Sequence, residues 1–211
     1  MNLRVQVSGR RQKIVYILIV ISMLIVIRWV CQSFAADPEI ALVYGEQWEN
    51  MRQRSSAKIG PAIPNNIGFR MPKSDARLNF IDPQYGFVTP PARFFAITFN
   101  KGKVDNIRMS PQVEPLQLDD ALKVVLDLQD QWRAQGWKAV TPISSPPFAD
   151  TPGWRALFRD KNKVGVTYWQ AGDRYQVLLG LNRFKDNRNP EQERYMIMLD
   201  LGSPWIPKDD E

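Results

Sequence analysis

The sequence predicts an α+β protein, with an N-terminal transmembrane helix followed by an antiparallel β-sheet domain packed against one main helix. Three observations lead to this class. Residues 14–27 form an uncharged stretch in which Ser22 alone is neither apolar nor aromatic. Residues 118–135 place apolar side chains at steps of three and four, which is typical of an amphipathic helix. Residues 92–109 and 164–201 contain segments that alternate apolar and polar side chains, as half-buried strands do.

The N-terminal apolar stretch follows several basic residues, and no acidic residue occurs before Asp37. Such a flank stays on the cytoplasmic side, so we expect the N-terminus in the cytoplasm and the C-terminus in the periplasm. Residues 1–12 are expected to be a cytoplasmic tail, and residues 13–34 a tilted anchor that spans the lipid bilayer of the inner membrane. The residues expected at the two membrane interfaces are Arg10, Arg11, Lys13, Tyr16, Arg28 and Trp29.

The same segment also fits a cleavable signal peptide. It has a basic start and an apolar centre of suitable length, and Ser33-Phe34-Ala35 has the small-x-small pattern of a cleavage site. Cleavage near Ala35 would release a secreted periplasmic protein. Against cleavage, Arg28 and Trp29 follow directly on an apolar centre rich in Ile, Leu and Val. The mass of the intact protein distinguishes the two alternatives.

Charge, histidine and cysteine usage limit the chemistry of the rest of the chain. Five of the 28 basic residues precede residue 37 and none of the 22 acidic residues does, so the exported part is nearly neutral. We therefore expect no nucleic-acid partner. The chain has no histidine, which excludes Ser-His-Asp and Cys-His catalysis and histidine metal ligands. Its one cysteine is Cys31, so we expect an exported domain without disulfides, metal or cofactor.

Residues 35–76 are expected to form a short helix and a linker between the anchor and the folded domain. Asp37-Pro38 is a suitable helix start, because proline is favoured at the first helical position. Ile40 and Val43 fit a helical period. Residues 55–73 contain prolines and glycines, which predict an extended linker or a loop that lies over the domain.

Residues 77–203 are expected to be the folded periplasmic domain, followed by a polar tail over residues 204–211. Hairpin turns are predicted at residues 100–102, where Gly102 can adopt a left-handed conformation, and at residues 171–173. The segment 154–158 fits either a helical turn or a short strand. The strands predicted within the domain are residues 77–81, 92–99, 104–109, 164–169, 174–183 and 194–201.

The main helix is expected over residues 118–135. Asp119 and Asp120 lie in its first turn, where they oppose the positive end of the helix dipole. Gly136 is placed to end the helix in a left-handed conformation. The apolar stripe of this helix consists of Leu118, Ala121, Leu122, Val125, Leu128 and Trp132.

No pair or cluster of residues predicts catalysis. Asp119 and Asp120 are adjacent on a helix, so their side chains do not converge on one substrate. Ser144 and Ser145 would need a lysine as base, and nothing in the sequence places a lysine beside them. We therefore expect a protein that is not an enzyme.

Aromatic residues in loops and at strand ends, with arginine nearby, are typical of protein interfaces. We therefore predict a protein-binding surface that meets a protein partner in the periplasm. The alternative is that these aromatic residues only close the ends of the sheet. The residues assigned to the surface are Trp137, Phe148, Trp154, Arg155, Trp169 and Arg174.

In layout the chain resembles small membrane-tethered periplasmic proteins of Gram-negative bacteria. The resemblance consists of an anchor and an α+β domain whose helix is bounded by Leu118-Asp119-Asp120-Ala121-Leu122 and Gln135-Gly136-Trp137. It implies an immunity protein that inhibits an envelope-acting toxin. The alternative that it implies is a structural or assembly accessory subunit of an envelope complex, such as a secretion or cell-wall complex.

Overall fold

The computed structural model describes residues 17, 19, 20, 22, 23, 37–140, 145–184 and 192–205. The chain divides into two compact units, residues 1–37 and residues 38–211, and each is considered by itself. In the first unit the five described residues before residue 37 are helical. The residues predicted at the membrane interfaces lie outside the described part: Arg10, Arg11, Lys13, Tyr16, Arg28 and Trp29.

The predicted fold class is wrong. The described chain is mostly β-sheet, with ten strands in two sheets and three helices, where one antiparallel sheet on one main helix was expected. The transmembrane helix of that prediction is corrected as well, because no helix of the described residues has the length and hydropathy to cross a membrane. Most of the additional strands pair with segments far away in the sequence, which local periodicity does not reveal.

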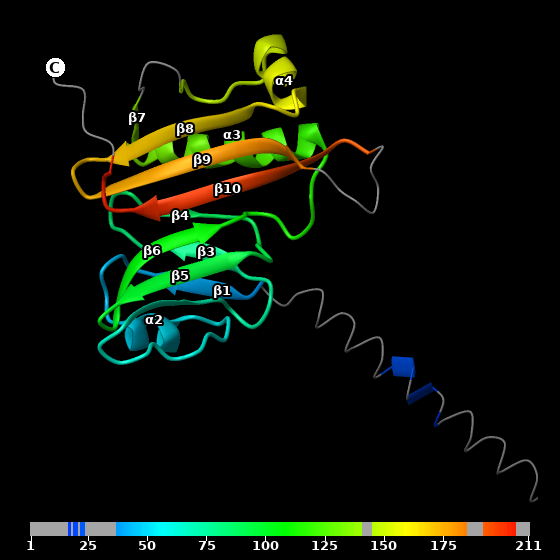
Figure 1. The fold of residues 1–211 in the computed structure, drawn as a ribbon. Helices are drawn as coiled ribbons and strands as arrows, with labels where there is room; N and C mark the ends of the chain where they lie inside the picture. Colours follow the sequence, from blue (N-terminus) through cyan, green and yellow to red (C-terminus); the bar gives the residue numbers. More distant parts are fainter. Residues whose placement is uncertain are drawn as a thin grey trace, which may run out of the picture. The chain divides into compact units, whose positions relative to one another are not determined.

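The larger sheet has seven strands in the order β2-β5-β6-β10-β9-β8-β7, and its neighbours are antiparallel (Figure 1). The two predicted hairpins are confirmed, but the first turn is shorter than expected. Lys101 and Gly102 have φ of 49° and 80° between paired Asn100 and Lys103, as a two-residue type I′ turn requires. The strands are β2 (Ile67–Arg70), β5 (Phe95–Asn100), β6 (Lys103–Met109), β7 (Lys138–Val140), β8 (Val164–Ala171), β9 (Tyr175–Phe184) and β10 (Arg194–Gly202).

The smaller sheet has the order β1-β3-β4, with β1 (Glu39–Leu42), β3 (Arg77–Phe80) and β4 (Phe87–Val88). The helix predicted to begin at Asp37-Pro38 is wrong, because β1 pairs in parallel with β3 and buries Ile40 and Leu42 beside it. A helix, α2 (Trp48–Arg54), begins only at Trp48. Its Trp48 ring packs on the Phe99 ring of β5, with centroids 5.2 Å apart.

Residues 55–73, expected to be a linker, belong to the packed structure. Ala57 and Ile59 are buried, and β2 forms one end of the larger sheet. Gly68 permits this pairing, because a Cβ atom there would lie 2.9 Å from the Phe99 ring. A side chain at residue 68 would therefore push β2 away from β5.

The predicted main helix is confirmed as α3 (Leu118–Ala134), and its predicted apolar stripe is buried. Its end is a Schellman motif, in which Gly136 has φ of 82°. The Trp137 N–H donates to the Trp132 carbonyl at 2.9 Å, and the Gly136 N–H donates to the Arg133 carbonyl at 3.1 Å. These bonds satisfy carbonyls that the helix end would otherwise leave free.

The core lies between one face of the larger sheet and a layer formed by α3 and the smaller sheet. Aromatic rings connect these parts: Phe80 contacts Phe87, Phe87 contacts Trp132, and Trp132 contacts Trp169, with centroids 5.4 to 5.7 Å apart. The third helix, α4 (Pro152–Arg159), starts at Thr151, whose Oγ1 accepts from the Trp154 N–H. All three helices therefore contribute to one side of the larger sheet.

Candidate functional site

No described cluster of side chains predicts metal or acid-base chemistry. Residues 37–140, 145–184 and 192–205 contain no group of three or more cysteine, aspartate or glutamate residues that could hold a metal ion, and the sequence has no histidine. The candidate sites are therefore surfaces and one cavity.

One face of the larger sheet carries no helix among the residues that the structure describes. Successive side chains of a strand point to opposite faces. Trp169 and Leu199 are buried on the side of α3, so Tyr168 and Met198 point to the other side. In Figure 1, α3 lies behind β8, β9 and β10, so the viewer faces this other side. We call it the open face, and its apolar residues are Ile67, Phe69, Met71, Phe94, Ala96, Val164, Val166, Tyr168, Leu178, Phe184, Met196 and Met198.

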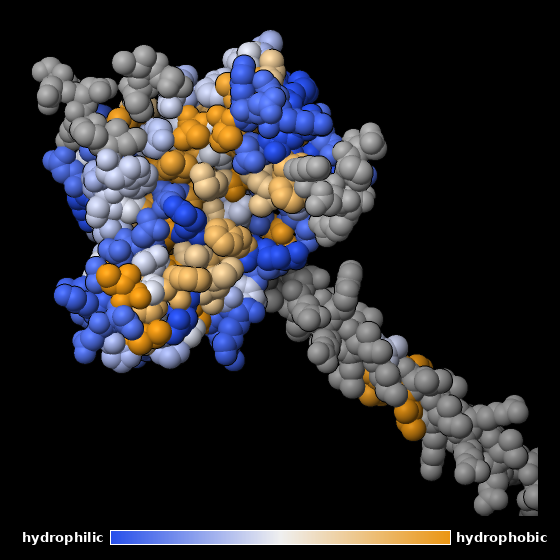
Figure 2. All heavy atoms as spheres, in the orientation of Figure 1, coloured by the Kyte–Doolittle hydropathy of each residue, from blue (hydrophilic) through white to orange (hydrophobic). Residues whose placement is uncertain are grey.

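The open face is richer in apolar side chains than a solvated sheet face, which is normally polar. Phe69 is 61% exposed, Val164 57%, Phe94 45% and Met198 39%. Figure 2, in the orientation of Figure 1, shows apolar residues spread across the middle of this face over several strands. A contiguous exposed apolar area of this kind is typical of a surface that contacts another molecule.

An ion pair crosses the centre of the open face from β6 to β10. The Asp200 carboxylate accepts from the Arg108 Nε at 2.8 Å and from the Asn106 Nδ2 at 2.8 Å. The Asp200 side chain is 13% exposed, whereas that of Arg108 is 59% exposed. The hydrogen-bonding capacity of the Asp200 carboxylate is thus met within the sheet. The same pair fixes the Arg108 side chain among the apolar side chains of the open face, and arginine is common at protein-binding hot spots.

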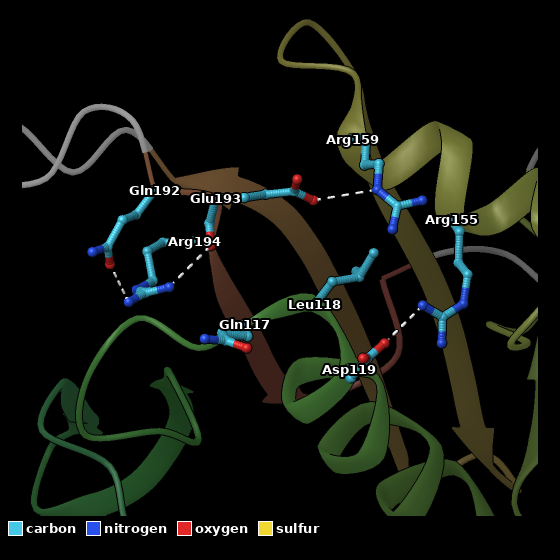
Figure 3. A pocket seen from close by; sticks show the side chains of 8 residues that line it. All are labelled: Gln117, Leu118, Asp119, Arg155, Arg159, Gln192, Glu193 and Arg194. Atoms are coloured by element: carbon cyan, nitrogen blue, oxygen red, sulfur yellow. Dashed lines mark hydrogen bonds and ion pairs between the residues drawn. The ribbon is translucent and has the colours of Figure 1, made fainter.

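A separate cavity of about 450 Å³ lies where α3 begins, between α4 and the start of β10 (Figure 3). Most of its charges are paired within the molecule, and Arg194 donates to the Gln192 side chain and to the Glu193 carbonyl. Arg155 donates to Asp119 at 2.7 Å and to Asp150 at 2.9 Å, and Arg159 lies 3.5 Å from Glu193. The lining consists of Gln117, Leu118, Asp119, Arg155, Arg159, Gln192, Glu193 and Arg194.

The protonation states of this cavity follow from the same pairs. Hydrogen bonds to Asp150 and Asp119 raise the pKa of Arg155. The hydrogen bond from Arg155 lowers the pKa of Asp150. These groups are therefore an ion-pair network that joins α4 to α3.

The structure separates the six residues that the sequence assigned to a binding surface. Trp137, Phe148 and Trp169 are at most 3% exposed, so their side chains offer no surface to a partner. Trp154 is half-buried and stacks on Phe158. The burial of Trp137, Phe148 and Trp169 fits the alternative, that these aromatic residues close the ends of the sheet, better than a binding surface.

Of the two arginines in that set, Arg155 lines the cavity, and Arg174 belongs to a hydrogen-bonded cluster around Asp82. Arg174 donates to the Asp82 Oδ2 at 2.7 Å, and the Tyr175 hydroxyl donates to the same oxygen at 2.9 Å. Burial opposes the charged form of Asp82, but hydrogen bonds from the backbone of Gln84 and Tyr85, and from Tyr175, lower its pKa overall. Burial and the bond to Asp82 raise the pKa of Tyr175.

The open face was missed because the sequence prediction assumed one buried face for each strand. A signal for it was present: in β10, Met196 and Met198 alternate with the buried Tyr195, Ile197 and Leu199. Apolar residues at both the odd and the even positions of a strand indicate that both faces of the sheet are covered there.

The comparisons with known proteins give no relative for this chain. No family model matches it, and no curated protein and no solved structure is significantly similar to it.

Proposed function

We propose that the chain is a non-enzymatic protein-binding module of the cell envelope, and that it binds its partner through the open face. The observation that supports this most is the set of exposed apolar side chains around Arg108 on a sheet face that no described helix covers. Methionine, aromatic residues and arginine are enriched in protein interfaces. The basic-then-apolar order of residues 4–31 supports an exported location.

A more specific form of the proposal is an inhibitor of an envelope-acting toxin. An inhibitor needs a rigid surface and no catalytic group. A seven-stranded sheet backed by a continuous core supplies such a surface, and the sequence without histidine is compatible with it.

Site-specific photo-crosslinking in cells tests the binding surface. A photoreactive amino acid is placed at Met198 or Phe94 on the open face, and at Lys123, whose side chain is 78% exposed on α3, as the control. We expect one adduct of the same mass from both open-face positions and none from Lys123. Adducts of equal yield at all three positions, or none at any position, would contradict the proposal.

The crosslinked partner then tests the inhibitor form. We expect the isolated partner to be toxic when directed to the envelope, and to lose this toxicity when the full chain is co-expressed. Co-expression of the chain with Met198→Glu should restore toxicity. A partner without toxicity that belongs to a secretion or cell-wall complex would instead support an accessory subunit.

A further inference from the structure

We propose that the edge strand β2 binds an extended, acidic segment of the partner, which pairs with it as an additional strand of the larger sheet. The inference rests on the proposed function and names the part of the partner that is recognised. Its support comes from an open backbone edge, from two exposed apolar side chains on that edge, and from cations around it without acidic partners.

The backbone edge of β2 is open. β2 is a terminal strand and pairs with β5. The Lys101 N–H, at the end of β5, donates to the Asn66 carbonyl at 3.1 Å. Backbone groups point alternately to the two sides of a strand, so the even-numbered residues face β5 and the amides of Ile67 and Phe69 face outward. Neither amide donates a hydrogen bond to another described residue.

The side chains on this edge are apolar and exposed. Ile67 is 68% exposed and Phe69 is 61% exposed, and both point to the open face. Natural edge strands are usually protected by charges or prolines that prevent pairing. Beside β2 the edge is covered by the chain itself, since Ile59 forms a β-bridge with Pro72 and the Lys73 N–H donates to the Lys58 carbonyl at 2.8 Å. Between Asn66 and Met71 the one charged side chain is that of Arg70, and the outward N–H groups of Ile67 and Phe69 leave room for a short incoming strand.

The charge around β2 selects an acidic partner. Residues 51–74 contain five basic residues and no acidic one. In the neighbouring turn between β5 and β6, the first acidic residue after Lys101 and Lys103 is Asp105. The same charge disfavours a second copy of this chain, because pairing β2 with itself would bring the two sets of cations together. The cations around β2 that form no ion pair with any described residue are Lys58, Arg70, Lys73, Lys101 and Lys103.

The contacts of the added strand follow from this geometry. Its backbone exchanges hydrogen bonds with the outward groups of Ile67 and Phe69, as in other complexes formed by strand addition. Alternate apolar side chains of the strand lie beside these two residues on the open face. Aspartate or glutamate at its ends lies near the cations. The Phe69 carbonyl now accepts from the Arg70 side chain at 3.0 Å, an exposed contact that an incoming N–H replaces.

A peptide titration of the full-length protein tests the inference. The probe is a short synthetic peptide of alternating valine and threonine between pairs of glutamates, and the control peptide has lysines in place of the glutamates. We expect the acidic peptide to slow hydrogen exchange at the amides of Ile67 and Phe69. The lysine peptide should bind about tenfold more weakly or not at all, and added salt should weaken the acidic peptide.

Two variants at one position separate backbone pairing from simple apolar contact. Ile67→Pro removes an outward N–H at the first residue of the strand, where proline is tolerated, without removing a bond to β5. It should weaken the acidic peptide about tenfold. Ile67→Val keeps the N–H and should stay within about twofold of the unchanged protein. Thermal unfolding of both variants checks that the domain is intact.

Several results would overturn the inference. They are unchanged binding to Ile67→Pro in a folded protein, unchanged exchange at Ile67 and Phe69, and equal binding of the two peptides. Slower exchange at these amides with phosphatidylglycerol vesicles, in place of the peptide, would instead identify a lipid surface. Crosslinks from Met198 that persist while the peptide fails to bind would leave the proposed function intact and refute only the role of β2.

Discussion

Asp82 shows at the scale of single residues how the domain joins segments that are far apart in the sequence. Its side chain is 2% exposed and lies in the connection between β3 and β4, whereas Arg174 and Tyr175 stand at the start of β9. The backbone N–H groups of Gln84 and Tyr85 donate to its other oxygen at 2.9 Å. The carboxylate is therefore stabilised in its charged form despite its burial.

Replacement of Asp82 by asparagine should lower the free energy of unfolding by about 2 kcal/mol, because the charged hydrogen bonds are lost. The loss should depend on pH. The pKa of Asp82 is lower in the folded protein than its ordinary value of 3.8, so its contribution is present above pH 3.8 and is lost as the pH falls through the folded value. Urea unfolding at neutral pH and below pH 3.8 measures this. Asp105→Asn, at an exposed position on β6, is the control and should change neither curve.

At the scale of elements, α4 and β8 approach closely because β8 has a glycine where the helix packs. A Cβ atom at Gly165 would lie 2.4 Å from the Phe158 ring and 3.2 Å from the Phe148 ring. The Phe148, Trp154 and Phe158 rings contact one another at centroid distances of 5.1 to 5.4 Å. A small residue in β8 thus positions this aromatic cluster and the arginines of α4 beside the cavity.

Gly165→Ala should therefore destabilise the protein by about 2 kcal/mol through overpacking. Gly153→Ala is the matched control in the same region, because the one non-neighbouring atom near its added Cβ would be the Thr151 hydroxyl at 4.0 Å. It should leave the midpoint of thermal unfolding unchanged or slightly raised. Equal midpoints for the two variants would contradict the packing argument.

Elements with a strong local signal could be predicted from the sequence, and elements formed by distant pairing could not. Helix α3 has a regular apolar stripe and a glycine at its end, and its predicted bounds agree with the structure to within one residue. β1 has no such signal, because Ile40 and Leu42 are covered only when β3, more than thirty residues later, pairs with it in parallel. β2 was missed because Gly68 weakens its alternating pattern. The same glycine makes the pairing of β2 with β5 possible.

The candidate site was less predictable than the fold, because the sequence does not show which aromatic residues are exposed. Trp137 and Trp169 stood at element ends in the sequence and were assigned to a surface, yet both are buried around Trp132. Met198, which alternates with buried residues of β10, was assigned to no surface and lies on the open face. A large aromatic residue near an element boundary serves the core as readily as an interface, and only the packed neighbours decide which.

At the scale of the whole domain, the two faces of the larger sheet require different kinds of side chain. On one face the side chains fill the core, and on the other they meet solvent or the proposed partner. Met198 and Leu199 are adjacent on β10 and belong to opposite faces, with exposures of 39% and 0%. They form a matched pair for separating folding from binding.

Met198→Glu should change the free energy of unfolding by about 0.5 kcal/mol or less, and should abolish the crosslink formed from Phe94. Leu199→Glu should lower the free energy of unfolding by about 4 kcal/mol or more, because it buries an unpaired charge. Chemical denaturation measures both effects. A large stability loss in Met198→Glu would show that this residue belongs to the core and would contradict the open face.

Arg108 provides a second comparison at this scale. Arg108→Met keeps an apolar stem on the open face but leaves the Asp200 carboxylate with the Asn106 amide as its one remaining described donor. We expect a loss of about 1 to 2 kcal/mol in unfolding free energy. The double variant with Asp200→Asn should recover part of it, which equilibrium unfolding can measure. No recovery would mean that the arginine contributes through packing alone.

The alternation of buried and open positions along β10 has a consequence for how this protein can change. Substitutions at Met196 and Met198 alter what a partner meets and leave the interior packing as it is. Replacement of Tyr195, Ile197 or Leu199, which alternate with them, alters the interior and leaves the outer chemistry as it is. A library randomised at Met196 and Met198 should therefore yield many folded proteins with new binding preferences.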